Sequence, residues 1–306
     1  MRKILITGGT VFVSRFTAEY FVANGDEVYV LNRGSREQAQ GVTLIQADRF
    51  SLTDELREME FDAVLDICAY SADHVNALLD ALGTFGDYIL LSSGAVYPDD
   101  AAQPVREDAP TGENAFWGDY GVHKRAAEEA LLRRVPDAYI LRPPYLYGPY
   151  ENLYRAPFLF DCALADRKIY IPESDRGIQF LHVRDLCRLM DALLTEHPEE
   201  HILNAAHPQA ISFRDWAAMC CEAAGKEPVM VRVDDNFPVR AYFPFPPCDY
   251  ILDTAKMTAI LPELTPLDEG IRQEFAWYTA SESPEINRHD YIAYIDSEFG
   301  ESARKN

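Results

Sequence analysis

Short apolar segments rich in β-branched residues alternate with segments of helical spacing through the first half of the chain. Between the apolar segments, hydrophobic residues recur as on one face of a helix. The predicted strands lie at 3–6, 27–31, 42–48, 62–68, 87–93 and 138–144, and the predicted helices at 16–25, 75–83 and 120–134, with another starting at Ser51. Because successive parallel strands need crossover connections, this rhythm predicts an α/β fold with a doubly wound parallel sheet, a Rossmann domain.

The alternation loosens after Pro149. A short strand leading into a helix is predicted at 180–194, and a further strand at 202–206. Helices are predicted at 213–225 and 267–278, with a weaker signal at 291–299, and the segment 238–248 is predicted to be irregular. Residues 1–150 and 178–206 are therefore assigned to the Rossmann domain, and residues 151–177 and 207–306 to a smaller α/β substrate-binding domain with a C-terminal tail.

Charge and hydropathy narrow the classes of function. The chain has 28 Lys and Arg against 50 Asp and Glu, a net charge of −22 at pH 7. That charge argues against nucleic-acid partners and against anionic membrane surfaces. No apolar run is long enough to cross a membrane, and the apolar part of MRKILITGGT is too short for a signal peptide. A cytoplasmic protein without a membrane partner is expected.

The cysteines and histidines give no metal or disulfide pattern. The six cysteines are spread along the chain without a CxxC pair, which is typical of reduced thiols. His197 and His201 are four residues apart, but Pro198 interrupts the helix that they would need as ligands. Two surface histidines and no bound metal are expected.

A glycine-rich turn, ITGGTVFVS (6–14), joins the first strand to the first helix. Small residues there let the backbone approach a pyrophosphate, and the helix N-terminus favours its charge. The pattern is incomplete, since Val11 and Ser14 replace two glycines of GxxGxxG, so a plain strand-to-helix turn is an open alternative. The expected cofactor contacts in this turn are Gly8, Gly9, Thr10, Phe12 and Val13.

The end of the second strand bears on the choice of cofactor. NAD-binding proteins usually place Asp or Glu there, whereas this chain has Asn32 and Arg33. A guanidinium can pair with a 2′-phosphate, so NADP is predicted, with NAD as the alternative. Arg33 as a solvated loop residue is the competing interpretation. Asp48 is placed to meet the adenine amino group, unless it serves only as the N-terminal acid of the next helix.

Tyr120 and Lys124 are four residues apart on a predicted helix and therefore share one face. The preceding strand ends in Ser92 and Ser93, at the sheet edge where such folds carry their sites. An ammonium group near a phenol lowers the phenol's pKa, so Tyr120 is expected to exchange a proton with a substrate oxygen. Ser93 would hold the same oxygen, and Lys124 would also hold the nicotinamide ribose.

With these motifs in this order, the chain resembles an extended or atypical short-chain dehydrogenase/reductase, and more narrowly the NAD-dependent epimerase/dehydratase family. The segments that carry the resemblance are SSGAVY (92–97), YGVHKRAAEE (120–129), LRPPYLYGP (141–149) and FLHVRDL (180–186), with WY at 277–278. The resemblance implies a Rossmann domain, a smaller substrate domain and a cleft between them. By position it implies a catalytic triad and further cofactor contacts: Ser93, Tyr120 and Lys124 for the triad, and Ser92, Pro143, Cys68, Ala69 and Tyr70 for the cofactor. It also implies a homodimer formed through helices at 72–82 and 120–134.

Where the chain departs from the family's motifs, the expected reaction and the expected substrate contacts become more specific. Family dehydratases carry an Asp-Glu pair where this chain has Gly94-Ala95, which disfavours a dehydratase. The usual nucleotide anchors are replaced by Tyr145 and Ile178, so Tyr145, Arg176 and Gln179 are the candidate substrate contacts besides Ser93. The aromatic residues Tyr242, Phe243 and Phe245 either line the substrate pocket or form core between the domains.

The expected function is an NAD(P)-dependent epimerase or reductase. It would transfer hydride to or from a hydroxyl or carbonyl carbon of a sugar-like substrate, which includes nucleotide sugars, with Tyr120 as the acid/base. The sequence leaves epimerase and reductase open. The alternatives are a catalytically silent cofactor-binding protein or an RNA-interacting protein on the same fold.

Overall fold

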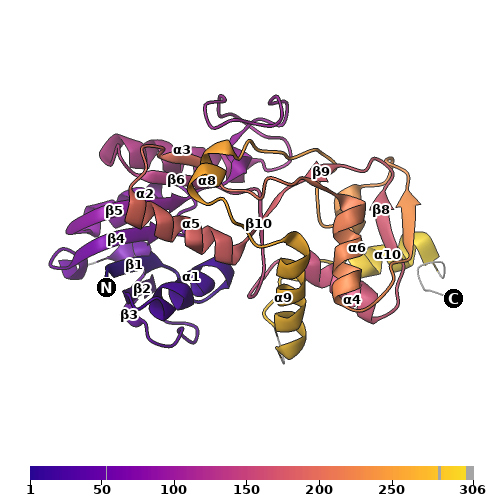
Figure 1. Ribbon diagram of the computed structural model, residues 1–306, viewed down its shortest axis with the longest axis horizontal. Coiled ribbons are helices and arrows are strands. Elements are labelled where there is room, and N and C mark those ends of the chain that lie inside the picture. The colour runs from indigo at the N-terminus through magenta and orange to yellow at the C-terminus, as the bar shows by residue number, and fades with distance from the viewer. Residues whose placement is uncertain (53, 282–283, 301–306) are drawn as a thin grey trace.

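The computed structural model describes residues 1–306 except 53, 282–283 and 301–306. It consists of two parts that lie side by side along the longest axis of the molecule (Figure 1). The N-terminal residue belongs to the part that contains the large sheet, and the described C-terminal helix lies in the other part.

The first part is built on a sheet of seven parallel strands in the order β11-β6-β5-β4-β1-β2-β3. Its central strands are buried on both faces, as in a sheet that helices cover on both sides. The predicted doubly wound parallel sheet is therefore confirmed. The strands are β1 (Lys3–Thr7), β2 (Glu27–Asn32), β3 (Thr43–Gln46), β4 (Glu60–Asp66), β5 (Thr84–Leu91), β6 (Tyr139–Arg142) and β11 (Ile202–Asn204).

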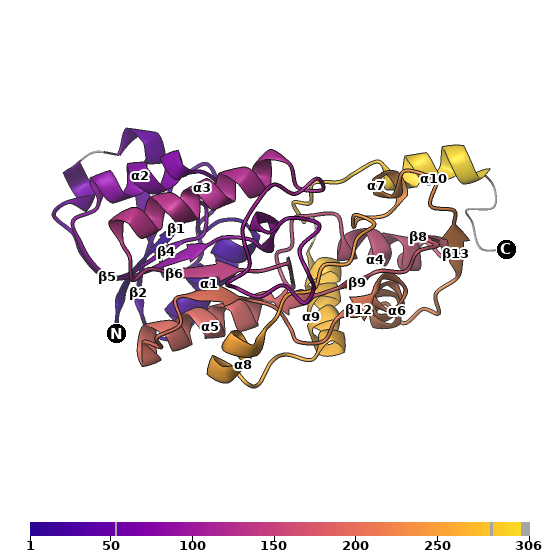
Figure 2. The same ribbon diagram turned by 90° about the horizontal axis from the view of Figure 1, so that it is seen from above.

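Helices cover the two faces of this sheet (Figure 2). On one face lie α1 (Phe12–Ala23) and α5 (Val183–Glu196), whose apolar side chains share a core with the sheet. On the other face lie α2 (Ala72–Ala81) and α3 (Asp119–Arg134), packed against each other. All four helices bring their N-termini to the edge where the strands end, as right-handed crossovers require.

The second part surrounds a separate, aromatic-rich core. Three pairs of short strands lie in or beside it: β7 with β10, β9 with β12, and β8 with β13. Those strands are β7 (Tyr145–Tyr147), β8 (Ile169–Pro172), β9 (Gly177–Ile178), β10 (Phe180–His182), β12 (Ile211–Ser212) and β13 (Met230–Val233). The helices that pack on them are α4 (Ala156–Leu164), α6 (Phe213–Ala223), α7 (Val239–Tyr242), α9 (Leu267–Ala280) and α10 (Tyr291–Phe299).

Three local features differ from the sequence-based expectation. The helix predicted from Ser51 is replaced by two 3₁₀ turns, Arg49–Ser51 and Asp54–Leu56. A four-residue helix, α7, lies within the segment predicted to be irregular. The helix α8 (Ala255–Ile260) lies within the predicted substrate domain, yet Met257 packs in the core between the sheet, α1 and α5.

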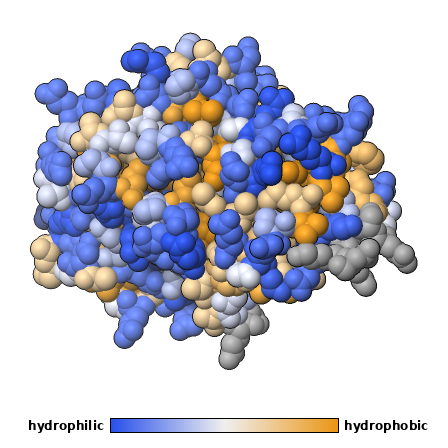
Figure 3. Space-filling model, turned by 45° about the vertical axis from the view of Figure 1, so that its right-hand side comes forward, coloured by the Kyte–Doolittle hydropathy of each residue, from blue (hydrophilic) through white to orange (hydrophobic). Residues whose placement is uncertain are grey.

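Hydrophilic residues cover most of the face shown in Figure 3, with apolar patches between them. Among the residues that the structure describes, no helix combines the length and the apolar character needed to cross a lipid bilayer.

Candidate functional site

The predicted site residues converge on the carboxyl ends of β1, β4, β5 and β6. Parallel strands end at a common edge, which is where open α/β sheets bind their ligands. The turns after these strands bring together the glycine-rich turn, the Cys68–Tyr70 segment, Ser92 and Ser93, and Pro143. The second part of the molecule brings two buried tyrosines, Tyr145 and Tyr250, to this edge.

The glycine-rich turn has the backbone that a dinucleotide site requires. Gly8 and Gly9 have φ angles of 93° and 94°, which favour glycine over any residue with a side chain. A Cβ on Gly8 would lie 2.7 Å from Cys68 Sγ, and one on Gly9 would lie 2.6 Å from Val30 Cγ1. Helix α1 then begins after Val11 without a capping side chain, so its first N–H groups are free for an anion. The turn fits a cofactor pyrophosphate.

The other residues of this turn have different environments. Thr10 and Val13 are partly exposed, whereas Phe12 is 7% exposed and its ring belongs to the core. A contact between Phe12 and a cofactor would therefore involve its backbone.

Asn32 and Arg33, at the end of β2, are the residues expected to determine whether the site prefers NAD or NADP. The Asn32 side chain closes back on the turn, where Nδ2 donates to Gly8 O at 2.6 Å. The Arg33 side chain is exposed and forms no ion pair within the described chain. Asp48 is also exposed, and its carboxylate accepts a hydrogen bond from Phe50 N at 2.9 Å, as the cap of a 3₁₀ turn. Arg33 is thus free to meet a 2′-phosphate.

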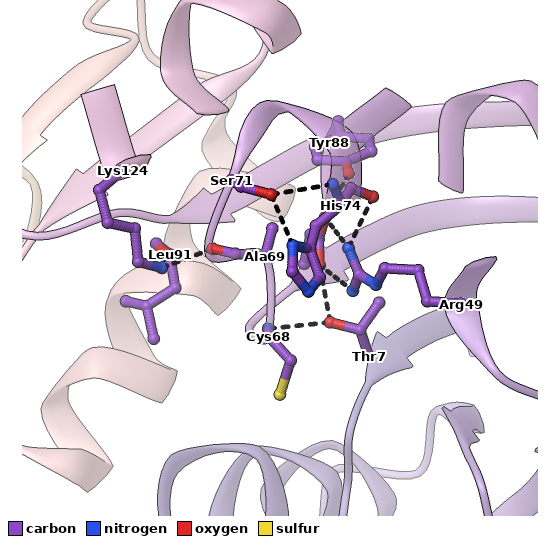
Figure 4. Close-up of polar contacts among 10 residues, drawn as sticks. Thr7, Arg49, Cys68, Ala69, Ser71, His74, Tyr88, Leu91 and Lys124 are labelled. Atoms are coloured by element: carbon purple, nitrogen blue, oxygen red, sulfur yellow. Dashed lines mark hydrogen bonds and ion pairs between the residues drawn. The ribbon is translucent and has the colours of Figure 1, made fainter. Parts of the chain in front are cut away.

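A buried polar network lies beneath the expected cofactor site (Figure 4). The fully buried carboxylate of Asp66, at the end of β4, accepts bonds from Thr7 Oγ1 at 2.7 Å, from Tyr88 Oη at 2.7 Å and from both terminal nitrogens of Arg49. Thr7 Oγ1 in turn accepts a bond from Cys68 N at 3.0 Å. The ion pair with Arg49 keeps the pKa of Asp66 low although burial opposes ionisation. The network fixes the ends of β1 and β4 relative to the Cys68–Tyr70 turn.

Lys124 is buried between strand ends and is 2% exposed. Its Nζ donates to Ala69 O at 2.7 Å and to Leu91 O at 2.8 Å, and it lies 4.9 Å from the centre of the Tyr70 ring. Burial lowers the pKa of Lys124 to about 8. The ammonium is therefore held by backbone carbonyls and covered by Tyr70, which is 51% exposed.

Tyr120 lies in the first turn of α3, with its side chain beside Ser93. The residue is 40% exposed overall, but partial burial of its phenol raises the pKa of Tyr120, while hydrogen bonding to Ser93 and the positive charge of Arg155 oppose the rise. The expectation that Lys124 lowers this pKa differs from what the structure shows. Lys124 is directed toward two carbonyl groups, and the cation that acts on Tyr120 is Arg155.

Ser92 and Ser93 face different environments, although they are adjacent. The Ser92 hydroxyl donates to the Glu128 carboxylate, which also holds Arg142 through two hydrogen bonds, at 3.0 and 2.6 Å. Ser92 is 3% exposed, so its side chain serves the protein interior and not the cofactor cleft. Ser93 faces the two phenols of Tyr120 and Tyr250. The buried carbonyl of Pro143 accepts a bond from Gly94 N at 2.9 Å and so supports the same turn.

The three further candidate substrate contacts, Tyr145, Arg176 and Gln179, differ in exposure and in the bonds that they already form. Tyr145 is 4% exposed, and its hydroxyl has no hydrogen-bond partner within the described chain. Arg176 lies 3.5 Å from Asp249 and borders a cavity of about 490 Å³ together with Phe237. Gln179 is 1% exposed and uses its side-chain oxygen to accept a bond from Leu252 N at 2.7 Å. Arg176 is thus accessible from a cavity, the buried Tyr145 hydroxyl is unpaired within the described chain, and Gln179 supports the fold.

Arg155 and Tyr250 lie at the site but were not predicted from the sequence. Arg155 is held by Glu151 and by Leu146 O, and its guanidinium lies 5.5 Å from the centre of the Tyr145 ring. The only signal for Tyr250 was its position after the aromatic, Pro-rich segment. The rings of Tyr242, Phe243 and Phe245 in that segment are fully buried in the aromatic core. The description of those three as core is therefore confirmed.

No group of three or more His, Cys, Asp or Glu side chains in the described part of the chain is arranged to hold a metal ion. The fold is a doubly wound parallel α/β sheet with a second, smaller part, and the expected site residues lie where its strands end. The model of the NAD dependent epimerase/dehydratase family matches residues 72–206. The resemblance to this family that the motifs predicted is thereby confirmed.

Individual relatives extend over more of the chain. The chloroplast stem-loop binding protein of 41 kDa b from Arabidopsis thaliana is 28% identical over 302 residues, which is 90% of this chain and 78% of that protein. A dTDP-4-dehydrorhamnose reductase from Streptomyces griseus is 28% identical over 157 residues, 47% of this chain and 50% of the reductase.

The fold is also found among solved structures. The enzyme WbmH of Bordetella bronchiseptica, in complex with NAD⁺, superimposes with a TM-score of 0.76 and 18% sequence identity. The superposition covers 92% of this chain and 100% of that one. At this level of identity, the likeness establishes the fold.

Proposed function

We propose that this protein is an NAD(P)-dependent oxidoreductase or epimerase that acts on a hydroxyl or carbonyl carbon of a sugar-like substrate, a nucleotide sugar above all. The observation that carries the proposal is the meeting of Ser93 and Tyr120 at the carboxyl edge of the sheet, with Lys124 buried beside them. The relative named as a dTDP-4-dehydrorhamnose reductase supports a nucleotide-sugar substrate.

The chemistry divides between the cofactor and the protein. A bound nicotinamide supplies hydride to the carbonyl carbon of the substrate or accepts it in the reverse direction. The Tyr120 phenol gives its proton to the carbonyl oxygen as the C=O bond becomes a C–O bond, and takes it back in the oxidation. The Ser93 hydroxyl donates a hydrogen bond to the same oxygen. The positive charge of Arg155 favours the phenolate that remains.

The first test is turnover of a panel of nucleoside diphosphate hexoses and their 4-keto derivatives with added cofactor. Tyr120→Phe removes only the phenol oxygen and should lower kcat by roughly 10²–10⁴-fold, the range for a lost acid/base group, with cofactor affinity little changed. Tyr29→Phe is the matched control, because the Tyr29 hydroxyl forms an exposed bond with Glu27 at the start of β2, away from the ends of the strands. An undiminished rate for Tyr120→Phe would remove this residue from its proposed role.

We further propose NADP as the preferred cofactor. The support is the exposed, unpaired guanidinium of Arg33 together with Asn32 in place of an acidic residue. The NAD⁺ complex of WbmH shows that this fold also accepts NAD. A lower KM for NADPH than for NADH is expected, and a clear preference for NADH would contradict the assignment.

The proposed reaction does not include loss of water. The family description covers dehydratases as well as epimerases, so the family match leaves this choice open. Gly94 and Ala95 supply no acidic side chain, and Ala95 is buried. Mass spectrometry of the products should show no compound lighter than its substrate by one water. Tight retention of cofactor through purification would indicate an epimerase, and exchangeable cofactor a reductase.

A second candidate function is binding of stem-loop RNA, which the name of the Arabidopsis relative favours. The net charge of −22 opposes it, because phosphate contacts require cationic side chains. An electrophoretic shift with a structured RNA at physiological salt would support this candidate. Cofactor binding without turnover of any substrate in the panel would instead indicate a silent binding protein.

A further inference from the structure

Tyr250 brings a second phenol to the catalytic serine from the other part of the molecule. Its backbone is fixed by a bridge to Ile178 and by a bond from Tyr250 N to Gly177 O at 2.8 Å. The residue is 7% exposed, and Ser93 is close enough to share a hydrogen bond with its hydroxyl, but the geometry falls short of a well-formed bond. A buried hydroxyl whose hydrogen bond is poorly formed costs free energy, which a ligand oxygen at this position would recover.

The Tyr250 hydroxyl lies in the space that a side chain at position 94 would occupy. A Cβ added to Gly94 would lie 2.4 Å from Tyr250 Oη and 3.1 Å from Tyr250 Cζ. The backbone of Gly94 does not itself require glycine, since its φ is outside the left-handed region. The missing side chain is therefore explained by the phenol, which takes the space beside the residue that follows Ser93.

The surroundings of Tyr250 keep it protonated. Burial raises its pKa well above the usual value, and the neighbouring phenols of Tyr145 and Tyr120 add to the rise, while Ser93 opposes it. Arg155 opposes the corresponding rise for Tyr120. Two phenols at one site thus differ in role: Tyr120 can exchange its proton, and Tyr250 remains a hydrogen-bond donor.

Aromatic packing holds the Tyr250 ring in place. Its centre lies 5.6 Å from the Tyr145 ring in an edge-to-face arrangement and 6.1 Å from the Trp117 ring. Edge-to-face pairs of this kind are stabilising beyond the area that they bury. The hydroxyl is therefore held in a fixed position, so this side chain would lose little conformational entropy when a ligand binds.

We propose that Tyr250 is a further substrate-binding residue, whose hydroxyl donates a hydrogen bond to a second oxygen of the substrate beside Gly94. The inference rests on the proposed function, in which Ser93 and Tyr120 already contact the reacting oxygen. It specifies the substrate class further: a carbonyl or alcohol that carries another oxygen close to the reacting carbon, as a sugar ring does.

The experiment compares two tyrosine variants of the full chain. Tyr250→Phe should lower kcat/KM by about 5–30-fold on the substrate of the panel that the unmodified chain turns over, the usual effect of one lost hydrogen bond. Tyr242→Phe is the matched control, because it removes another buried, unpartnered hydroxyl from the same part of the molecule without touching the site. Both variants should melt within a few degrees of the unmodified protein.

Deoxy analogues of that substrate separate a contact from a structural effect. An analogue that lacks the oxygen in question should react equally with the unmodified chain and with Tyr250→Phe. A loss of equal size on every analogue would indicate a structural role and overturn the proposal. Gly94→Ala provides a second variant: its cost should be smaller in the Tyr250→Phe background than alone, because the oxygen that the new methyl meets is absent.

The outcomes distinguish the two proposals. Turnover that is lost in Tyr120→Phe but unchanged in Tyr250→Phe would overturn the role of Tyr250 and leave the proposed function intact. If the unmodified chain turns over no substrate of the panel, the proposed function fails and the role of Tyr250 fails with it.

Discussion

At the scale of single residues, the electrostatic environment of Tyr120 depends on a cation that the YxxxK spacing does not reveal. Arg155 lies in the segment between β7 and α4, where Nε donates to Glu151 at 2.5 Å and a terminal nitrogen donates to Leu146 O at 2.8 Å. Its charge lowers the pKa of Tyr120, whereas the Lys124 ammonium is engaged by two backbone carbonyls. Arg155 therefore acts on the pKa of Tyr120 without being part of the YxxxK motif.

Arg155→Gln should raise the pKa of Tyr120, because the charge that favours the phenolate is removed. Reduction needs the protonated phenol, so its rate should fall at a higher pH than in the unmodified protein. Oxidation needs the phenolate, so its rate should also rise only at a higher pH. Profiles of kcat/KM against pH in both directions measure this shift. Arg155→Lys keeps the charge and is the control; identical profiles for all three proteins would contradict the role of Arg155.

The residues of the site were predictable to the extent that their chemistry is local. The glycine turn and the Tyr120–Lys124 pair are close in sequence, so spacing alone predicts that the first precedes a helix and that the second lies on one helix, as in the structure. Ser92 was expected in the cofactor cleft, but its hydroxyl bonds to Glu128, which comes from a different element. Tyr250 reaches Gly94 only through the tertiary fold, and no spacing rule connects them.

At the scale of elements, α3 is joined to the sheet by a buried ion pair in addition to apolar packing. Glu128 lies one helical turn after Lys124, and its carboxylate binds Arg142 of β6 and Ser92, which follows β5. Both charged side chains are 5% exposed. The pair fixes the helix that carries Tyr120 and Lys124 relative to the ends of two strands.

Glu128→Ala should destabilise the protein by roughly 3–5 kcal/mol, because the Arg142 guanidinium would remain buried without its partner. Glu129→Ala, the next residue on α3, removes an exposed pair with Arg125 and should cost no more than about 1 kcal/mol. Urea denaturation midpoints of the two variants give the comparison. Equal midpoints would show that the buried pair does not hold the helix.

Most elements were predictable because strands and helices differ in the period of their apolar residues. The exceptions are short. The residues Arg49–Ser51 and Asp54–Leu56 form 3₁₀ turns; Asp48 caps the first of them, and Arg49 pairs with the buried Asp66. The helix α8 lies among residues assigned to the second part, and only the packing of Met257 and Leu261 shows that it covers the sheet.

At the scale of the whole molecule, two buried carboxyl groups meet where the parts join. Glu151 follows β7, and Glu274 belongs to α9; they are 1% and 0% exposed. Glu274 accepts a bond from Gly148 N at 3.0 Å, and Glu151 is paired with Arg155. Burial, followed by the charge of Glu151, raises the pKa of Glu274 well above its usual value, which favours the protonated form in the folded protein.

Because the pKa of Glu274 is raised, the stability of the contact between the two parts should depend on pH. The stabilisation from protonated Glu274 is complete below the pKa of an unfolded glutamate and is lost as the pH rises through the folded pKa, because the unfolded chain binds fewer protons there. The side chain in Glu274→Gln stays neutral at every pH. The melting temperature of this variant minus that of the unmodified protein should therefore be larger at pH 9 than at pH 5. Each 1 kcal/mol corresponds to roughly 2–4 °C. Glu269→Gln, exposed on the same helix, is the control; an equal difference at both pH values would contradict the assignment.

The order of the strands has a consequence for synthesis on the ribosome. The edge strand β11 and the covering helix α8 follow much of the second part in the chain. A nascent chain that ends at Pro149 therefore lacks one edge of its sheet and the helices α5 and α8 that bury one of its faces. The seven-stranded sheet is consequently completed only after much of the second part has been synthesised, and a fragment that ends between residues 150 and 178 should unfold at a lower urea concentration than the full chain.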